Sequence, residues 1–204
     1  MLDMMKRRHI LAAMLAALCA AGPAAADKIS LGELSSYLNA MTTAQAPFTQ
    51  VSDDGSLSTG KLYLKRPGRA RFEYDPPNAS QVIAGAGSVL VVDPKSNQPA
   101  ESYPLGRTPL SIILAPRVDL GRANMVVDHA YDGTATIVTA QDPEHPDYGS
   151  IELMFTDNPV ELRKWVIHDG SGTSTTVILG ALETGMNLPD KLFSTLIKQN
   201  GSNR

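Results

Sequence analysis

The chain has 204 residues, of which 43% are hydrophobic and 19% charged, with 18 basic and 21 acidic side chains. This length is enough for one domain with a substantial core. The acidic excess argues against a nucleic-acid interface, which needs a basic patch, and against an electrostatic grip on anionic lipid.

The first 26 residues have the pattern of an export signal. Residues 6–8 are basic, and residues 10–21 are apolar but too short to span a bilayer, which takes about 20 residues. Three alanines at 24–26 provide a cleavage site. We therefore expect a signal at 1–26 and a single exported domain at 27–204, located in the periplasm. The twin arginine leaves both the general and the folded-protein export routes open.

Cys19 is the only cysteine, so the exported domain has none and its stability must come from its core rather than from disulfides. Cys19 also allows an alternative, a lipid-modified N-terminus. Leu18 precedes it, however, where a lipobox needs a small residue, which favours the unmodified domain.

Residues 30–41 are predicted to form a helix. Ser30 and Glu33 make a capping box, with Ser30 as the N-cap. The apolar residues follow at helical spacing on one stripe: Leu34, Tyr37, Leu38 and Met41. The stripe indicates that this helix packs on a core.

Residues 60–77 are predicted to form a β-hairpin with one apolar face. Leu62, Leu64 and Arg66 share a parity, so Arg66 points the same way as the apolar pair. After a Pro-Gly turn, Ala70, Phe72 and Tyr74 share a parity as well. An inward arginine has five donors that need acceptors, and free carbonyls at a helix end can supply them.

A second, shorter helix is predicted at Pro109–Leu114. Thr108 is the expected N-cap, with a proline at the first helical position. Leu110, Ile113 and Leu114 form its apolar face. So short a helix must dock on another element, and its last carbonyls are candidate acceptors for Arg66.

The remaining chain alternates short strands with turns, without repeats or a second domain. We therefore predict an α+β fold: one curled antiparallel sheet, an unclosed half-barrel, with the two helices as a lid on its concave face. With aromatic residues at only 5%, any cavity beneath the lid is expected to be aliphatic and suited to acyl chains.

No catalytic or metal-binding motif is evident. The exported domain has His129, His145 and His168 in separate segments. An acidic stretch at 142–147 carries side chains that could bind a metal, but we interpret it as a solvated loop. We expect no enzyme activity, cofactor or metal.

Several motifs in order resemble the LolA family of outer-membrane lipoprotein carriers. The resemblance rests on Phe48-x-Gln50, on Gly60-x-Leu62 followed by Arg66-Pro67, and on Phe72, Tyr74 and Pro77. Later pieces are Thr108-Pro109-Leu110, Leu162-Arg163-Lys164-Trp165 and Leu188-Pro189-Asp190. Taken together and in this order, the motifs span nearly all of the exported domain.

The resemblance implies a monomeric carrier that binds the acyl chains of lipoproteins beneath the lid. It also implies loading by an inner-membrane ABC transporter, LolCDE, and delivery to an outer-membrane acceptor such as LolB. Arg66 would gate the lid, and Arg69, Ala70 and Phe72 would contact the transporter. The expected lining of the acyl-chain cavity is Leu34, Leu38, Met41, Leu62, Leu64, Phe72, Tyr74, Leu110, Ile113 and Leu114.

One position departs from the family pattern, since many members have phenylalanine where this chain has Ala70. Next to a Pro-Gly turn, we expect Ala70 to be half exposed and tolerant of a larger side chain. Two alternatives to the carrier function remain: a sensory or interaction module of the cell envelope with the same half-barrel, and a carrier of another lipid.

Overall fold

The computed structural model describes residues 28–96 and 99–195. The predicted export signal lies outside these residues. Within the described part, no helix is long and apolar enough to cross a membrane.

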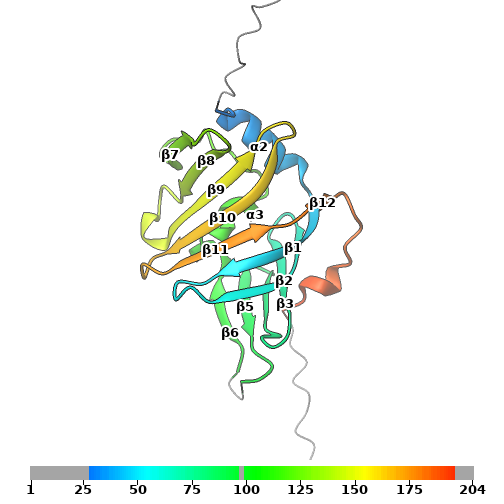
Figure 1. Ribbon diagram of the computed structural model, residues 1–204. Helices are drawn as coiled ribbons and strands as arrows, with labels where there is room; N and C mark the ends of the chain where they lie inside the picture. Colours follow the sequence, from blue (N-terminus) through cyan, green and yellow to red (C-terminus); the bar gives the residue numbers. More distant parts are fainter. Residues whose placement is uncertain (1–27, 97–98, 196–204) are drawn as a thin grey trace, which may run out of the picture.

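The described chain is built around one antiparallel sheet (Figure 1). Its strands run in the order β6-β5-β4-β3-β2-β1-β11-β10-β9-β8-β7, with the short β12 paired to β1 off this path. The strands are β1 (Thr43–Val51), β2 (Leu57–Lys65), β3 (Arg69–Tyr74), β4 (Gln81–Gly85), β5 (Ser88–Val92), β6 (Glu101–Pro104), β7 (Val126–Tyr131), β8 (Thr136–Gln141), β9 (Gly149–Thr156), β10 (Glu161–Asp169), β11 (Ser174–Leu179) and β12 (Glu183–Thr184).

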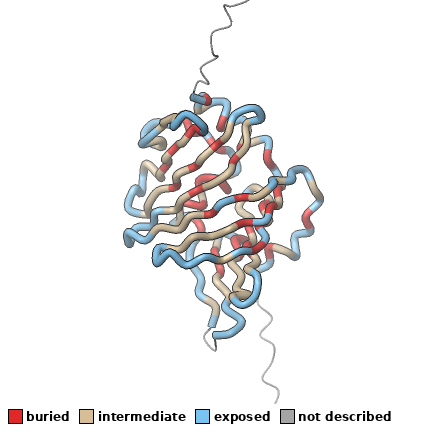
Figure 2. The backbone as a smooth tube through the Cα atoms, viewed as in Figure 1, coloured by how far each residue is buried: buried red, intermediate tan, exposed pale blue. Residues whose placement is uncertain are grey.

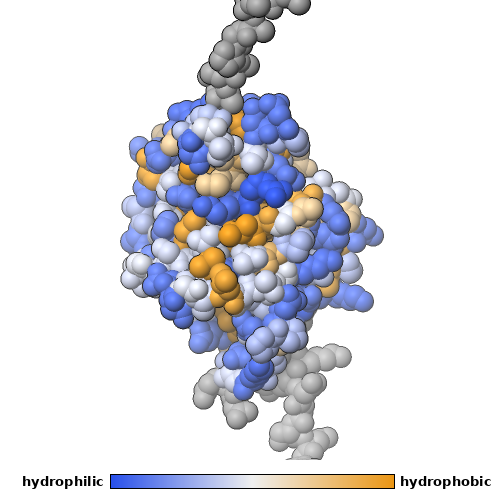
Figure 3. Space-filling model, in the orientation of Figure 1, coloured by the Kyte–Doolittle hydropathy of each residue, from blue (hydrophilic) through white to orange (hydrophobic). Residues whose placement is uncertain are grey.

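The sheet is curled but not closed, because the edge strands β6 and β7 do not pair with each other. Buried positions alternate along the strands, as Figure 2 shows for β8 to β10. They give the sheet one apolar inner face, while the outer face in Figure 3 is mostly hydrophilic with an apolar band over its middle strands. The predicted unclosed half-barrel is confirmed.

Two α-helices cover the inner face: α2 (Leu31–Ala40) and α3 (Leu110–Leu114). Their buried side chains belong to the same core cluster as the inner face of the sheet, and both helices lie behind the sheet in Figure 1. The Ser30 hydroxyl caps α2 by accepting from the Glu33 amide at 3.2 Å, as expected. The lid arrangement predicted from the sequence is therefore present.

The side-chain cap predicted for α3 is wrong. Thr108 Oγ1 donates to the Leu105 carbonyl at 2.8 Å, in the 3-10 turn η1 (Leu105–Arg107), instead of accepting from an amide of α3. The helix depends on packing instead, since four of its five residues are buried.

One β-bulge determines what β10 presents to the inner face. The register shifts between Leu162 and Lys164, so Leu162 pairs with Phe155 and Trp165 pairs with Leu153. Simple alternation would put Leu162 and Trp165 on opposite faces. The extra residue lets both point inward, and both are fully buried.

The outer face carries a segment that the sequence did not predict. A C-terminal strap, residues 188–193, includes the 3-10 turn η3 (Asp190–Phe193) and packs over β3 and β4. Leu188 and Phe193 are buried there. A third 3-10 turn, η2 (Pro146–Tyr148), precedes β9.

Candidate functional site: a lid fastened by an arginine

Arg66 ties both lid helices to the hairpin of β2 and β3. Its guanidinium donates to the Leu38 carbonyl in the last turn of α2 and, at 2.7 Å, to the Ala115 carbonyl at the end of α3. These are carbonyls that a helix leaves without intrahelical partners or nearly so. The contact between Arg66 and helix-end carbonyls expected from the sequence is thus present.

Asn39 joins α2 to the segment that follows α3, residues 118–120. Its side chain donates to the Val118 carbonyl at 2.8 Å and accepts from the Val118 amide at 2.9 Å. The same Asn39 oxygen accepts from Arg66 at 3.2 Å. One turn earlier on α2, the Ser35 hydroxyl accepts from the Leu120 amide at 3.0 Å. The lid therefore behaves as one hydrogen-bonded unit, and sequence analysis gave no sign of the role of Asn39.

The turn between β2 and β3 also bonds to α3 through its backbone. The Gly68 amide donates to the Leu114 carbonyl at 2.8 Å. Gly68 has a φ of 71°, a conformation that favours glycine. The hairpin turn thus meets the end of α3 through two donors, Arg66 and Gly68.

On the outer face, the same hairpin is held by the C-terminal strap. Lys65 and Arg69 face each other in register, and both contact Asp190 Oδ1, at 2.6 and 2.7 Å. The two cations lower the pKa of Asp190. Arg71 donates to the Leu192 carbonyl at 3.1 Å.

Aromatic side chains meet across the inside of the curled sheet. The ring of Phe72 on β3 lies 6.3 Å from that of Trp165 on β10, edge to face at 84°. Phe72 also contacts Phe48 at 5.5 Å, and Phe48 contacts Tyr74 at 5.2 Å. The rings connect strands that are not neighbours in the sheet.

Two partly buried tyrosine hydroxyls lie beside these rings. The Tyr74 hydroxyl donates to Gln50 at 2.6 Å, and burial raises the pKa of Tyr74 to about 12. Burial also raises the pKa of Tyr37, whose hydroxyl accepts from the Leu162 amide at 3.1 Å beside the bulge. Tyr37 packs edge to face on Phe155 at 5.9 Å, which seats α2 on β9 and β10.

The residues expected to line an acyl-chain cavity gather in one place. Nine of them are buried and belong to the single core cluster between lid and sheet, and Tyr74 packs against it partly buried. In this conformation their side chains pack on one another. Their contact with acyl chains stays a proposal. The nine are Leu34, Leu38, Met41, Leu62, Leu64, Phe72, Leu110, Ile113 and Leu114.

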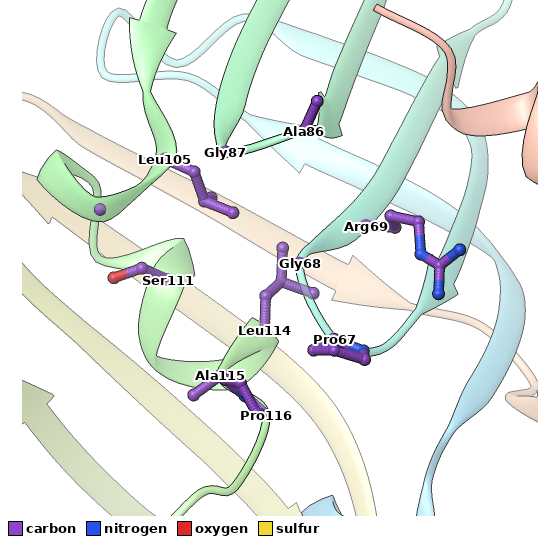
Figure 4. A pocket seen from close by; sticks show the side chains of 11 residues that line it. Pro67, Gly68, Arg69, Ala86, Gly87, Leu105, Ser111, Leu114, Ala115 and Pro116 are labelled. Carbon is purple, nitrogen blue, oxygen red and sulfur yellow. The ribbon is translucent and has the colours of Figure 1, made fainter.

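An apolar pocket of about 570 Å³ opens at the end of α3, between the β2–β3 turn and the β4–β5 turn (Figure 4). Leu105 and Leu114 point into it. Both leucines also belong to the core cluster, so the pocket borders the apolar interior through these two side chains. The pocket lies beside the bonds that Arg66 and Gly68 make to the lid.

The expected exposure of Ala70 is wrong. Ala70 is fully buried, because its strand pairs on both sides, with Leu64 on β2 and Ala84 on β4, and the lid covers its inner face. Phe72 is buried too. In this conformation neither offers a surface to a transporter. Arg69 is partly exposed but paired with Asp190, so of the three predicted contacts it alone stays a candidate.

The histidines are dispersed in the structure. His129 contacts the Ile29 carbonyl at 2.9 Å, His168 contacts the Ser174 hydroxyl at 2.9 Å, and His145 stacks on Tyr148. Among the described residues, no group of three or more His, Cys, Asp or Glu side chains could hold a metal ion.

The fold and the site together define a class: an unclosed antiparallel half-barrel with an apolar interior, covered by a helical lid that a single arginine fastens. Residues 39–195 match the sequence profile of the family described as outer membrane lipoprotein carrier protein LolA, and the chain belongs to that family.

Two relatives named outer-membrane lipoprotein carrier protein agree with this assignment. An outer-membrane lipoprotein carrier protein of Methylococcus capsulatus is 27% identical, over 86% of this chain and 88% of the relative. One of Azotobacter vinelandii is 24% identical, over 85% and 87%. Among solved structures, a LolA superfamily protein from Nitrosomonas europaea superposes on 81% of this chain and on 98% of its own length, with a TM-score of 0.40 and 9% sequence identity.

Proposed function

We propose that this protein is a periplasmic carrier for lipid-modified proteins, which binds their acyl chains between the lid and the inner face of the sheet. Its family and the names of its relatives support the carrier role. The observation that carries the proposal is the double attachment of Arg66, to Leu38 and Ala115, because one side chain of the hairpin then holds both lid helices over the apolar interior.

Loading and delivery follow from the energetics of acyl chains. Burial is worth about 0.8 kcal/mol per methylene, so a chain of about sixteen carbons resists transfer into water by roughly 13 kcal/mol. Cargo must therefore pass directly between apolar sites. We propose an inner-membrane ABC transporter of the LolCDE type as donor and an outer-membrane acceptor such as LolB as receiver, with the energy supplied by the transporter.

The role of Arg66 is tested by replacing it with leucine. Arg66→Leu removes the guanidinium bonds to Leu38, Asn39 and Ala115 but leaves the bond from the Gly68 amide, so it should increase binding of an environment-sensitive hydrophobic dye and impair cargo transfer. Arg66→Lys should give an intermediate result, because an ammonium lacks the planar fork that reaches carbonyls on two helices. Arg163→Leu is the matched control, since Arg163 is paired with Glu161 on β10 and partly exposed. Equal dye binding and equal cargo transfer in the Arg66 variants and the control would show that Arg66 does not hold the lid closed.

The ligand itself is tested by native mass spectrometry of protein purified from the periplasm. The carrier function predicts a mass increase equal to an acylated protein. Bound free lipid alone would indicate a carrier of another lipid, and a stable complex with an unacylated protein would indicate an interaction module.

A further inference from the structure

The indole N–H of Trp165 is buried without an acceptor. Trp165 is fully buried on the inner face of β10, and its Nε1 is one of two buried side-chain nitrogens without a partner among the described residues, the other being Nε of Arg66. A buried indole N–H usually finds a hydrogen-bond partner, and most buried polar atoms have one. The exception at Trp165 therefore needs a physical explanation.

The neighbours of Trp165 explain why no protein group serves. Its register partners are Leu153 on β9 and Val177 on β11, both apolar, and the ring that it meets from the opposite wall is Phe72. A buried water needs two to four polar partners, and these neighbours provide none. An acceptor carried by a molecule that is otherwise compatible with apolar walls would satisfy this donor.

The position of Trp165 puts it in the path of any chain bound beneath the lid. Its ring and that of Phe72 meet from opposite walls of the half-barrel, so a guest lying along the inner face has to separate them. Once the rings separate, the indole N–H is a donor without a protein partner that a guest beside it can satisfy. An apolar chain with one carbonyl near its end satisfies both the walls and the donor.

Building on the proposed function, we propose that Trp165 recognises the ester carbonyl that links an acyl chain to its head group, by donating its indole N–H to that oxygen. Trp165 is then a specificity-determining residue. It distinguishes acyl chains joined by esters from hydrocarbon of the same length without a carbonyl.

The test compares two soluble probes on the whole exported domain. One is a cysteinyl peptide carrying a thioether-linked glycerol with two eight-carbon ester-linked chains, and the other has the same chains in ether linkage. One hydrogen bond predicts that the parent protein binds the ester probe about two- to tenfold more tightly. Trp165→Phe retains an aromatic ring but no donor, and it should bind both probes equally.

Trp165 also supplies its own reporter, because it is the only tryptophan in the chain. Its single indole cross-peak in a ¹H–¹⁵N spectrum should move downfield with the ester probe and less with the ether probe. This measurement needs no variant, so it decides the matter even if Trp165→Phe fails to fold, which circular dichroism would reveal.

The outcomes separate the two proposals. Equal affinity of the parent for both probes, together with equal indole shifts, would overturn the role of Trp165 and leave the carrier function intact. An ester preference that persists unchanged in folded Trp165→Phe would overturn it as well. A parent protein that binds neither probe would overturn the carrier function and this inference together.

Discussion

The ring of Phe72 contacts that of Trp165 although three strands separate β3 from β10 in the sheet. Four steps of about 4.8 Å would place these strands roughly 19 Å apart in a flat sheet. The centroid distance of 6.3 Å therefore measures how far the sheet has curled. It also shows that side chains from opposite walls complete the core in this conformation.

This contact should be energetically coupled. A double-mutant cycle with Phe72→Leu and Trp165→Leu, each of which removes one ring, should give a coupling of about 0.5–1.5 kcal/mol in urea unfolding, the range for an edge-to-face aromatic pair. Trp165→Leu combined with Leu57→Ala is the control, because Leu57 is 70% exposed on β2 and should be additive. Additivity in the Phe72 cycle as well would mean that the two walls are independent.

Asn39→Ala should loosen the lid without removing the arginine. It leaves the amide and carbonyl of Val118 unpaired near the core, which predicts a loss of about 1–3 kcal/mol in the free energy of unfolding and stronger binding of a hydrophobic dye. Ser36→Ala, on the exposed side of α2, should change neither quantity. If Asn39→Ala matches Ser36→Ala in both measurements, the two lid segments are not joined through Asn39.

Ala70→Phe should destabilise the protein rather than fill an open mouth. Adding a ring at a fully buried position predicts a loss of about 1–3 kcal/mol, measured by urea unfolding. Ala40→Phe at the exposed end of α2 should stay within about 0.5 kcal/mol of the parent. An Ala70→Phe variant as stable as the Ala40→Phe control would show that the site can expand at little cost.

Gly85→Ala should displace the C-terminal strap. A Cβ at Gly85 would lie 2.4 Å from the carbonyl oxygen of Phe193, whereas a Cβ at Gly106 would meet nothing within 4 Å. We expect trypsin to cleave after Lys191 several-fold faster in Gly85→Ala and at the parental rate in Gly106→Ala. Equal rates in all three proteins would mean that the strap adjusts to the added methyl group.

The raised pKa of Tyr74 predicts that the protein loses stability at high pH. Its folded-state pKa of about 12 lies above the usual 10.0, so its contribution is complete below pH 10 and is lost as the pH rises towards 12. Tyr74→Phe should be less stable than the parent at pH 8, because the bond to Gln50 is gone, yet its urea midpoint should fall less steeply between pH 9 and 11.5. Parallel declines in both proteins would assign the alkaline effect to other groups.

The sequence predicts those features that follow from local periodicity. The parity of Leu62, Leu64 and Arg66 is enough to aim Arg66 inward, and an inward arginine needs helix-end carbonyls because sheet carbonyls are already paired. Ser30 and Glu33 likewise determine the start of α2 through neighbours three residues apart. In each case the deciding interaction is local or follows from a single unmet donor.

Features that depend on distant segments were not predictable in this way. Exposure of Ala70 depends on whether the lid and β4 cover the hairpin, which its neighbours along the chain do not reveal. Leu162 and Trp165 both face inward only because of the bulge at residue 163, and a bulge leaves no clear mark in a single sequence. Lys65 and Arg69 look like a solvated face until Asp190, more than a hundred residues later, pairs with both.

The first residues before α2 give the lid a fixed pivot. The Ile29 amide donates to the buried Thr136 hydroxyl on β8 at 3.0 Å, while the opposite end of α2 is fastened by Arg66. At 1.5 Å per residue the ten-residue helix is a lever about 15 Å long. Turning it by about 20° around Ile29 would carry its last turn roughly 5 Å away from the sheet. A small angular movement at a point far from the arginine would thus be amplified into an opening at the apolar interior, where the proposed acyl cargo would enter.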